Sequence, residues 1–186
     1  EPHMLFNTLA NLRVLIATDP ERAQAMLDRL IAFLRATLSA SRSGRHTLAA
    51  EFDRLSDYLA LMGVRMGPRL QSRLDLPDAL RELAVPPLLL QPLVENSIKH
   101  GLEPKVEGGL IDVQARRDGD ALVIVVRDTG VGLPPGAPPV ETGFGLLQVR
   151  ERLATLYGAA ASLTLAPATD AAAGTVATLR LPWTPD

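Results

Sequence analysis

Apolar residues recur at three- and four-residue intervals through the first third of the chain, a spacing that places them on one face of a helix. The pair Asp19-Pro20 divides this region, because aspartate favours the N-cap and proline the first position of a helix. The first of the two helices would carry Leu5, Leu9, Leu12 and Ile16 on one face. The second would carry Leu27, Leu30, Ile31, Leu34 and Leu38 along one stripe.

A polar segment with a glycine, residues 39–45, is the predicted linker after this helical hairpin. A third helix follows Thr47 and would bury Phe52, Leu55, Leu59 and Met62. The later elements predicted are a strand at 70–76, a helix from Pro86 to about His100, strands at 110–117 and 121–128, a loop at 133–142, a helix at 145–157, and strands at 161–166 and 175–181. The pattern predicts an α+β fold, in which a helical hairpin at 1–45 precedes a domain at 46–186 with helices on one face of a five-stranded sheet.

The composition of the chain argues against several classes of function. The 186 residues are 47% hydrophobic and carry a formal charge of −2, so no broad electrostatic attraction to nucleic acid is expected. The chain has no cysteine, which excludes disulfides and thiolate metal sites and fits a reducing compartment. No apolar run reaches the roughly 18 residues of a membrane span. Because the chain opens on Glu1 with a motif already under way, we expect a sensor or membrane anchor upstream.

A carboxylate framed by glycines ends the apolar strand at 121–128, where the sequence DTGVG runs from Asp128 to Gly132. A strand-end carboxylate can accept a hydrogen bond from the exocyclic amino group of adenine. Gly130 and Gly132 would let the backbone approach the ring where a Cβ would clash. Taken alone, the motif is more typical of an ordinary Asp-Gly turn.

Asn96 lies near the end of the helix predicted at 86–100. Its amide oxygen is a hard ligand that suits Mg²⁺, an ion that keeps several waters when it bridges phosphates. Lys99 and His100 would lie near the same face and reach phosphate oxygens. The alternative is a solvated helix end with Gly101 as the residue after the C-cap.

The sequence GFG at 143–145 opens the helix at 145–157. The N–H groups and dipole of a helix start favour anions, and Gly143, Gly145 and the backbone of Leu146 would receive a phosphate. The alternative is a flexible hinge. The loop at 133–142 would then close over the nucleotide as a lid.

In this order, an asparagine helix, a strand ending in DxGxG, a loop and a GxG-opened helix resemble the sequence boxes of the GHKL ATP-binding superfamily. That resemblance implies an α/β sandwich with a five-stranded mixed sheet and three helices, ATP as ligand, and Mg²⁺ on Asn96. Gyrase-type members carry a glutamate four residues before the asparagine as the base for a water. Pro92 occupies that position here and has no proton-accepting side chain, which disfavours hydrolysis.

The segment PHMLFNTL at 2–9 resembles the H box of LytS-type sensor histidine kinases, which usually reads PHFLFN. The similarity continues through PPLLLQPLVEN at 86–96 and VRERL at 149–153, with Met4 and Gln148 as departures. It implies that His3 is the nucleophile toward the γ-phosphoryl group of ATP, with Asn7 one turn later on the same face. No acid follows His3 directly, so its proton acceptor is not evident from the sequence.

The resemblance further implies a homodimer through the helical hairpin, a response regulator whose aspartate receives the phosphoryl group, and a place as the cytoplasmic domain of a bacterial inner-membrane protein. The main alternative is a degenerate module that holds nucleotide without transferring it. A gyrase-type hydrolase is the second alternative, and the histidine spacing does not suit zinc.

Overall fold

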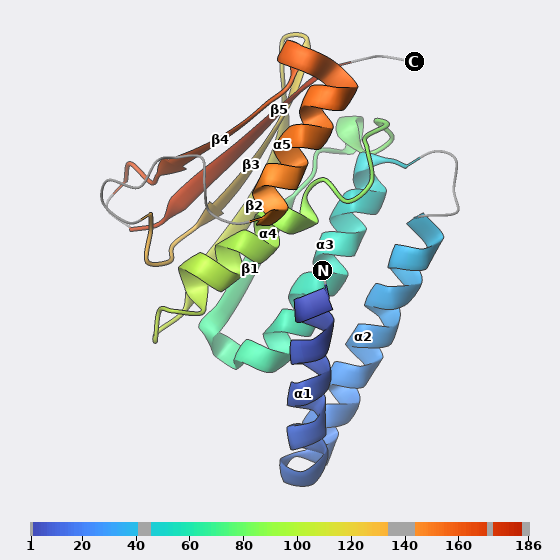
Figure 1. Ribbon diagram of the computed structural model, residues 1–186, viewed down its shortest axis with the longest axis vertical. Helices are drawn as coiled ribbons and strands as arrows, with labels where there is room; N and C mark the ends of the chain where they lie inside the picture. Colours follow the sequence, from blue (N-terminus) through green and yellow to red (C-terminus); the bar gives the residue numbers. More distant parts are fainter. Residues whose placement is uncertain (1, 41–45, 134–143, 171–172, 184–186) are drawn as a thin grey trace.

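The computed structural model describes residues 2–40, 46–133, 144–170 and 173–183, with the side chains at 2, 3, 40 and 144 outside the description. Three long helices come first, followed by a sheet interleaved with two further helices (Figure 1). The helices are α1 (Pro2–Thr18), α2 (Pro20–Ala40), α3 (Leu48–Met66), α4 (Gln91–Asn96) and α5 (Phe144–Tyr157). The strands are β1 (Leu70–Asp75), β2 (Gly109–Asp118), β3 (Ala121–Asp128), β4 (Ser162–Pro167) and β5 (Thr175–Pro182).

The five strands form one mixed sheet in the order β1-β2-β3-β5-β4. β1 runs parallel to β2, and every other pair is antiparallel. In Figure 1, α4 and α5 lie in front of the strands, and α3 packs beside them on the same side. The α+β fold and the five strands expected from the sequence are confirmed.

The core lies between this helical layer and the inner face of the sheet. Alternate residues of β2 and β3, such as Ile111, Val113 and Val126, are fully buried because each strand turns every second side chain to that face. α5 contributes Leu146, Val149 and Leu153 to the same core cluster. In α3 all four residues predicted to be buried are buried, and Thr47 caps its start by accepting a hydrogen bond from the amide of Ala50 at 3.2 Å.

The helical hairpin forms where the sequence predicts it, and Asp19 caps α2 by accepting from the amide of Arg22 at 3.2 Å. Each predicted apolar stripe is only partly buried within the single chain. α2 buries Ala23, Met26, Leu30 and Phe33, whereas Leu27, Ile31, Leu34 and Leu38 are 38–60% exposed. In α1, Leu9 and Ile16 are exposed, and Thr8 faces inward instead. Both helices are apolar on more than one face. One face of α2 packs on α3, and α1 packs mainly on α2.

The helix predicted from Pro86 begins five residues later, at Gln91. The intervening backbone is held in an irregular path, with a positive φ of 62° at Leu88. The buried carboxylate of Glu51 in α3 accepts hydrogen bonds from the amides of Leu88 (2.8 Å) and Leu90 (3.2 Å) and contacts His46 Nε2 at 2.7 Å. From α5, Arg152 donates to two carbonyl groups of the same segment. These contacts satisfy backbone groups that a longer helix would have paired internally.

We expect Glu51→Gln to lower the free energy of unfolding by roughly 2–4 kcal/mol, because an amide cannot accept all of these hydrogen bonds with both of its heavy atoms. Asp53→Asn on the exposed side of the same helix is the control and should change stability by less than about 0.5 kcal/mol. Urea unfolding of both variants measures the difference. Equal stabilities would show that Glu51 does not hold this segment.

Candidate functional site

A pocket lies where α4, the end of β3 and the start of β5 meet. Its walls include four of the residues singled out from the sequence, Asn96, His100, Asp128 and Gly132. It is also lined by Ser97, Gly101, Val131, Leu133 and Thr175. The pocket therefore unites the asparagine helix and the DTGVG segment, although 32 positions separate Asn96 from Asp128 in the chain.

Asp128 lies at the end of β3 with a side chain that is only 1% exposed. Burial raises the pKa of its carboxyl group above the ordinary value, and hydrogen bonds from the Gly130 amide, the Ser97 side chain and the Thr175 backbone oppose this rise. The Gly130 amide donates to Oδ1 at 2.9 Å. The carboxylate is thus fixed in orientation by the protein while still lining the pocket.

Two glycines allow α4 and the DTGVG segment to approach. A Cβ at Gly101 would lie 2.8 Å from Oδ1 of Asp128, and a Cβ at Gly130 would lie 2.2 Å from the backbone of Gly101. The Gly101 carbonyl also accepts from the amide of Val131 at 3.0 Å. The alternative in which Gly101 follows the end of the helix is wrong. The helix continues as a π-helical turn, η3 (Ser97–Leu102), and Gly101 does not have a positive φ.

Lys99 does not share the pocket with His100, contrary to the expectation that both would reach the same phosphate. It lines a separate groove between α1, α3 and α4. Lys99 and His100 follow Asn96 by three and four positions, and their side chains point to different sides of the helix. Both residues lie in the π-helical turn, which is wider than an α-helical turn. His100 therefore lines the pocket, and Lys99 lines the groove beside α1.

The start of α5 is only partly described. Gly143 and the loop residues 134–142, including the proposed lid, lie outside the described residues. Gly145 is exposed, and a Cβ there would meet only Pro92 at 3.7 Å. The side chain of Leu146 is buried in the core, so only its backbone is available to a ligand.

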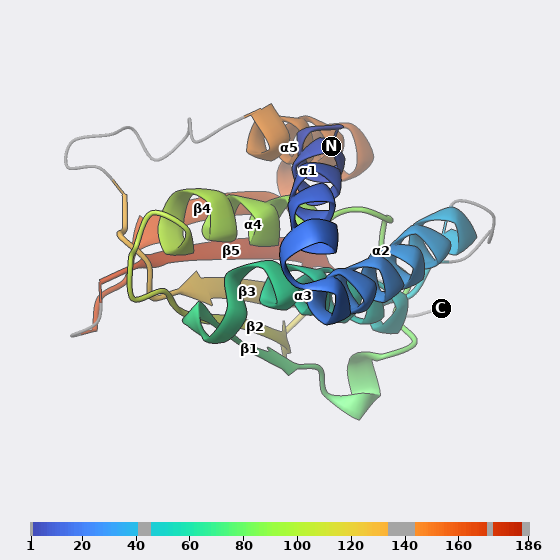
Figure 2. The ribbon, with the colours of Figure 1, turned by 90° about the horizontal axis from the view of Figure 1, so that it is seen from below.

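The groove beside α1 was not foreseen from the sequence. Met4 and Asn7 of α1 face Tyr58, Met62 and Arg65 of α3 and Glu95, Ile98, Lys99 and Glu103 of the α4–η3 segment. Figure 2 shows α1 passing beside α4 and α3. The backbone of His3 lies in the first turn of α1, and its side chain is outside the described residues. The H-box helix and the pocket-lining helix are therefore neighbours.

Comparison with known proteins agrees with this geometry. Residues 87–185 match the family model described as "Histidine kinase-, DNA gyrase B-, and HSP90-like ATPase", which covers more than half of the chain. The chain belongs to this ATPase family. Residues 1–70 of this family member match a second model, "Histidine kinase". The resemblance to LytS-type sensor histidine kinases is thereby confirmed, and so is the use of ATP.

Two curated relatives of this ATPase-family chain are sensor proteins. It is 33% identical over 172 residues to "Sensor protein LytS" of Staphylococcus haemolyticus, covering 87% of the chain and 30% of that protein. It is 34% identical over 184 residues to "Sensor histidine kinase BtsS" of Escherichia coli, covering 98% and 32%. The chain thus spans about a third of the length of these relatives.

Solved structures support the fold. The histidine kinase domain of the blue-light activated histidine kinase from Erythrobacter litoralis superposes with a TM-score of 0.59 at 18% identity, covering 94% of this chain and 85% of that one. Histidine kinase ThkA in complex with response regulator protein TrrA superposes with a TM-score of 0.56 at 16% identity, covering 98% and 60%.

We expect Gly101→Ala to weaken ATP binding at least about tenfold, which corresponds to roughly 1.4 kcal/mol, because the new methyl group would displace the Asp128 carboxylate. Gly63→Ala is a matched control, since a Cβ there meets nothing within 4 Å. Calorimetric titration with a non-hydrolysable ATP analogue reports both dissociation constants, and circular dichroism verifies folding. Unchanged affinity in a folded Gly101→Ala protein would contradict this assignment of the pocket.

Proposed function

We propose that this chain is the kinase core of a two-component sensor. It binds ATP with Mg²⁺, transfers the γ-phosphoryl group to His3, and passes that group to an aspartate of a response regulator. The observation that carries the proposal is the position of α1, whose residues Met4 and Asn7 line a groove against the helix that also walls the nucleotide pocket. An enzyme that only hydrolysed ATP would not need α1 beside the helix that walls the nucleotide pocket.

In this proposal Asp128 recognises adenine. Its fixed carboxylate accepts a hydrogen bond from the exocyclic amino group, which guanine lacks at that edge. Gly132 lets the adenine ring approach the backbone. Gly130 has a different role, because its lack of a Cβ allows the close contact with the backbone of Gly101. Binding of ATP in preference to GTP follows from this arrangement.

Asn96 is the residue we assign to Mg²⁺, and His100 is assigned to the phosphates, with Gly143, Gly145 and the Leu146 amide as further phosphate contacts. No group of three or more histidine or acidic residues suited to a metal occurs within the described parts of the chain. In this proposal the ion arrives with the triphosphate, keeps several of its waters and takes one amide oxygen from the protein. Bound there, the ion would neutralise charge that develops on the phosphates.

The absence of a base at position 92 also supports transfer over hydrolysis. Pro92 lies in the first turn of α4, and its ring carbon approaches Gly145. Glu95, the nearest acid, lines the groove beside α1 instead of the nucleotide pocket. A water held in the pocket would find no carboxylate in the position that gyrase-type enzymes use.

We further propose that the response regulator docks on a homodimer formed through the hairpin, and that a membrane-bound sensor segment precedes the chain in the whole protein. Within the described ranges, no helix is long and apolar enough to cross a bilayer. The complex of ThkA with its response regulator TrrA is the structural precedent for regulator docking. In this proposal the regulator's aspartate receives the phosphoryl group that leaves His3.

Incubation of the chain with γ-labelled ATP tests the main proposal. We expect label that is stable to base and lost in acid, as a phosphorylated histidine is, and its loss in His3→Gln. Asn11→Gln, farther along α1, is the control and should retain label. ATP binding without any label in the unmodified chain would favour the degenerate module, and steady phosphate release without protein label would favour a hydrolase.

The exposed apolar stripe of α2 supports the dimer. Leu27, Ile31, Leu34 and Leu38 follow one another at four-, three- and four-residue steps and remain exposed in the single chain. Phe6, Leu9, Val14 and Ile16 of α1 are exposed as well. Such a spacing is that of a helix seam that a second copy can cover.

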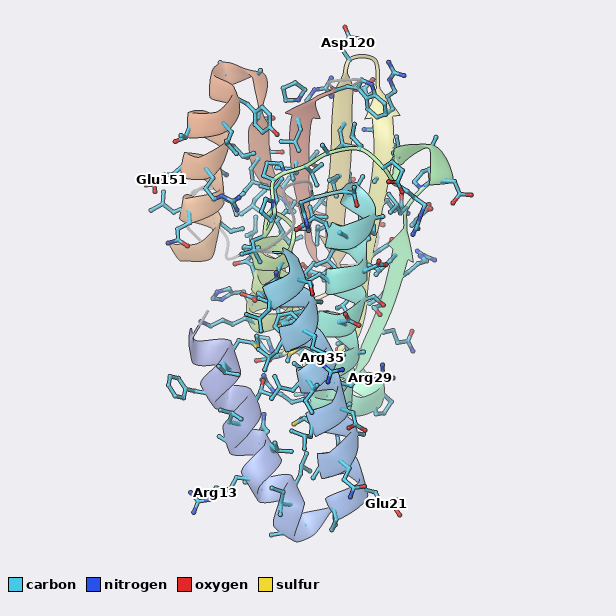
Figure 3. The ribbon with its side chains drawn as sticks, turned by 90° about the vertical axis from the view of Figure 1, so that its right-hand side faces the viewer. Arg13, Glu21, Arg29, Arg35, Asp120 and Glu151 are labelled. Atoms are coloured by element: carbon cyan, nitrogen blue, oxygen red, sulfur yellow. The ribbon has the colours of Figure 1, made fainter. Side chains whose placement is uncertain are left out.

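We expect Ile31→Glu combined with Leu34→Glu to shift the chain from dimer to monomer, raising the dimer dissociation constant by about 100-fold or more, because charge would be buried in the seam. Arg29→Glu combined with Arg35→Glu is the control, since both arginines project from α2 into solvent (Figure 3). Sedimentation velocity over a concentration series distinguishes the two proteins. If the two double variants had equal dimer dissociation constants, the dimer seam would lie elsewhere on the chain.

A further inference from the structure

A lysine outside the nucleotide pocket holds the backbone of one of its walls. Lys105 lies half-buried in the loop between η3 and β2, and the described residues that line the pocket do not include it. We propose that Lys105 is a positioning residue for adenine recognition, acting through the peptide group between Thr129 and Gly130. This inference rests on the proposed function, because it concerns how Asp128 is oriented toward adenine in the same pocket.

The contact that carries the inference joins the lysine side chain to one peptide group. The ammonium group of Lys105 donates a hydrogen bond to the carbonyl oxygen of Thr129 at 2.8 Å. The N–H of the same peptide group is that of Gly130, and it donates to Oδ1 of Asp128 at 2.9 Å. The lysine, the peptide group and the carboxylate therefore form one continuous chain of hydrogen bonds that ends in the pocket.

A peptide group transmits orientation from one end to the other because it is planar. Its C=O and N–H bonds point in opposite directions when the peptide is trans, so a donor that fixes the oxygen also fixes the direction of the N–H. A hydrogen bond from an ammonium group is charge-assisted, and it polarises the peptide group so that the N–H donates more strongly. Lys105 thus sets both the direction and the strength of the hydrogen bond that Asp128 accepts.

This peptide group needs to be held because a glycine follows it. Gly130 is required for the close approach of Gly101, but a residue without a Cβ also accepts φ angles of either sign. The preceding residue is anchored, since the Thr129 amide donates to the Leu110 carbonyl at 3.1 Å and the Thr129 hydroxyl accepts from the Leu110 amide at 3.0 Å. Rotation of the peptide group between Thr129 and Gly130 is the freedom that remains, and the bond from Lys105 restricts it.

The backbone that carries the lysine is itself fixed. Gly108 has a positive φ of 68°, and a Cβ there would lie 2.0 Å from the carbonyl oxygen of Arg69, so the loop packs closely on the residue before β1. The Arg69 guanidinium donates to three carbonyl oxygens of the same loop, those of Glu103 (3.0 Å), Lys105 (2.9 Å) and Val106 (3.0 Å). Only the side chain of Lys105 therefore has to be ordered by its bond to the peptide group.

Direct binding of a phosphate group is the alternative role for the ammonium group, and the two roles differ in the ligands that they affect. A phosphate contact would contribute to the binding of ATP but not to that of adenosine, which has no phosphate. An oriented Asp128 carboxylate serves the adenine ring, so the loss of its orientation weakens both ligands to the same extent.

Titration of the chain with ATP and with adenosine, followed by NMR, separates these roles. We expect Lys105→Met to raise both dissociation constants by the same factor, about tenfold. Lys105→Arg keeps a charged donor and should stay within about threefold of the unmodified chain. The control is Arg180→Met, which removes a cation paired with Asp118 at the other end of the β2–β3 ladder and should change neither constant.

Hydrogen exchange at the Gly130 amide reports the orientation of the peptide group directly. In the nucleotide-free Lys105→Met chain this amide should exchange at least about tenfold faster than in the unmodified chain. Unchanged dissociation constants or an unchanged exchange rate in Lys105→Met would overturn the inference, and so would weaker binding of ATP alone. If Lys105→Met does not fold, a Gly130 amide that exchanges in the unmodified chain as fast as an unprotected amide overturns it instead.

Failure of the kinase function has a different outcome. An unmodified chain that binds ATP and adenosine but forms no phosphohistidine would refute phosphoryl transfer and leave the role of Lys105 in adenine binding intact. An unmodified chain that binds neither ligand would refute both proposals.

Discussion

The position of α4 depends on a buried carboxylate. Six residues are too few to form a stable helix by themselves, so α4 must be held by its surroundings. Glu51 binds the amides just before it, and the contact between Gly101 and Gly130 fixes the π-helical turn just after it. Leu88 adopts its unfavourable positive φ only because these contacts and the two hydrogen bonds from Arg152 determine the path of the chain.

This short helix forms the wall between two sites. Asn96 and His100 line the pocket proposed for the nucleotide, whereas Glu95 and Lys99 line the groove beside α1. A displacement of α4 would therefore change both sites together. Because Gln91 ties the same helix to Arg54, and Arg54 packs on Phe33 of α2, the hairpin and the nucleotide pocket are connected through contiguous polar and aromatic contacts.

The hairpin has apolar residues on two faces for a related reason. One face, including Met26, Leu30 and Phe33, joins the core with α3. The other carries the exposed stripe from Leu27 to Leu38. A helix with a single apolar face would be covered by α3 alone, and the second face is the one proposed for the seam with a second copy.

The amino-acid sequence by itself determined the kind and order of the elements and the ATPase family, because helix periodicity, capping residues and glycine spacing are local properties. Asp19 and Thr47 cap the helices where their chemistry predicted, and Asp128 ends its strand. Only the tertiary structure decided which face of α2 is buried, since both faces are apolar and the choice depends on what α3 presents. It also placed Lys99 in the groove, delayed α4 until Gln91, and gave Gly101 its role against Asp128. Each of these depends on contacts between residues far apart in the chain, which no local pattern contains.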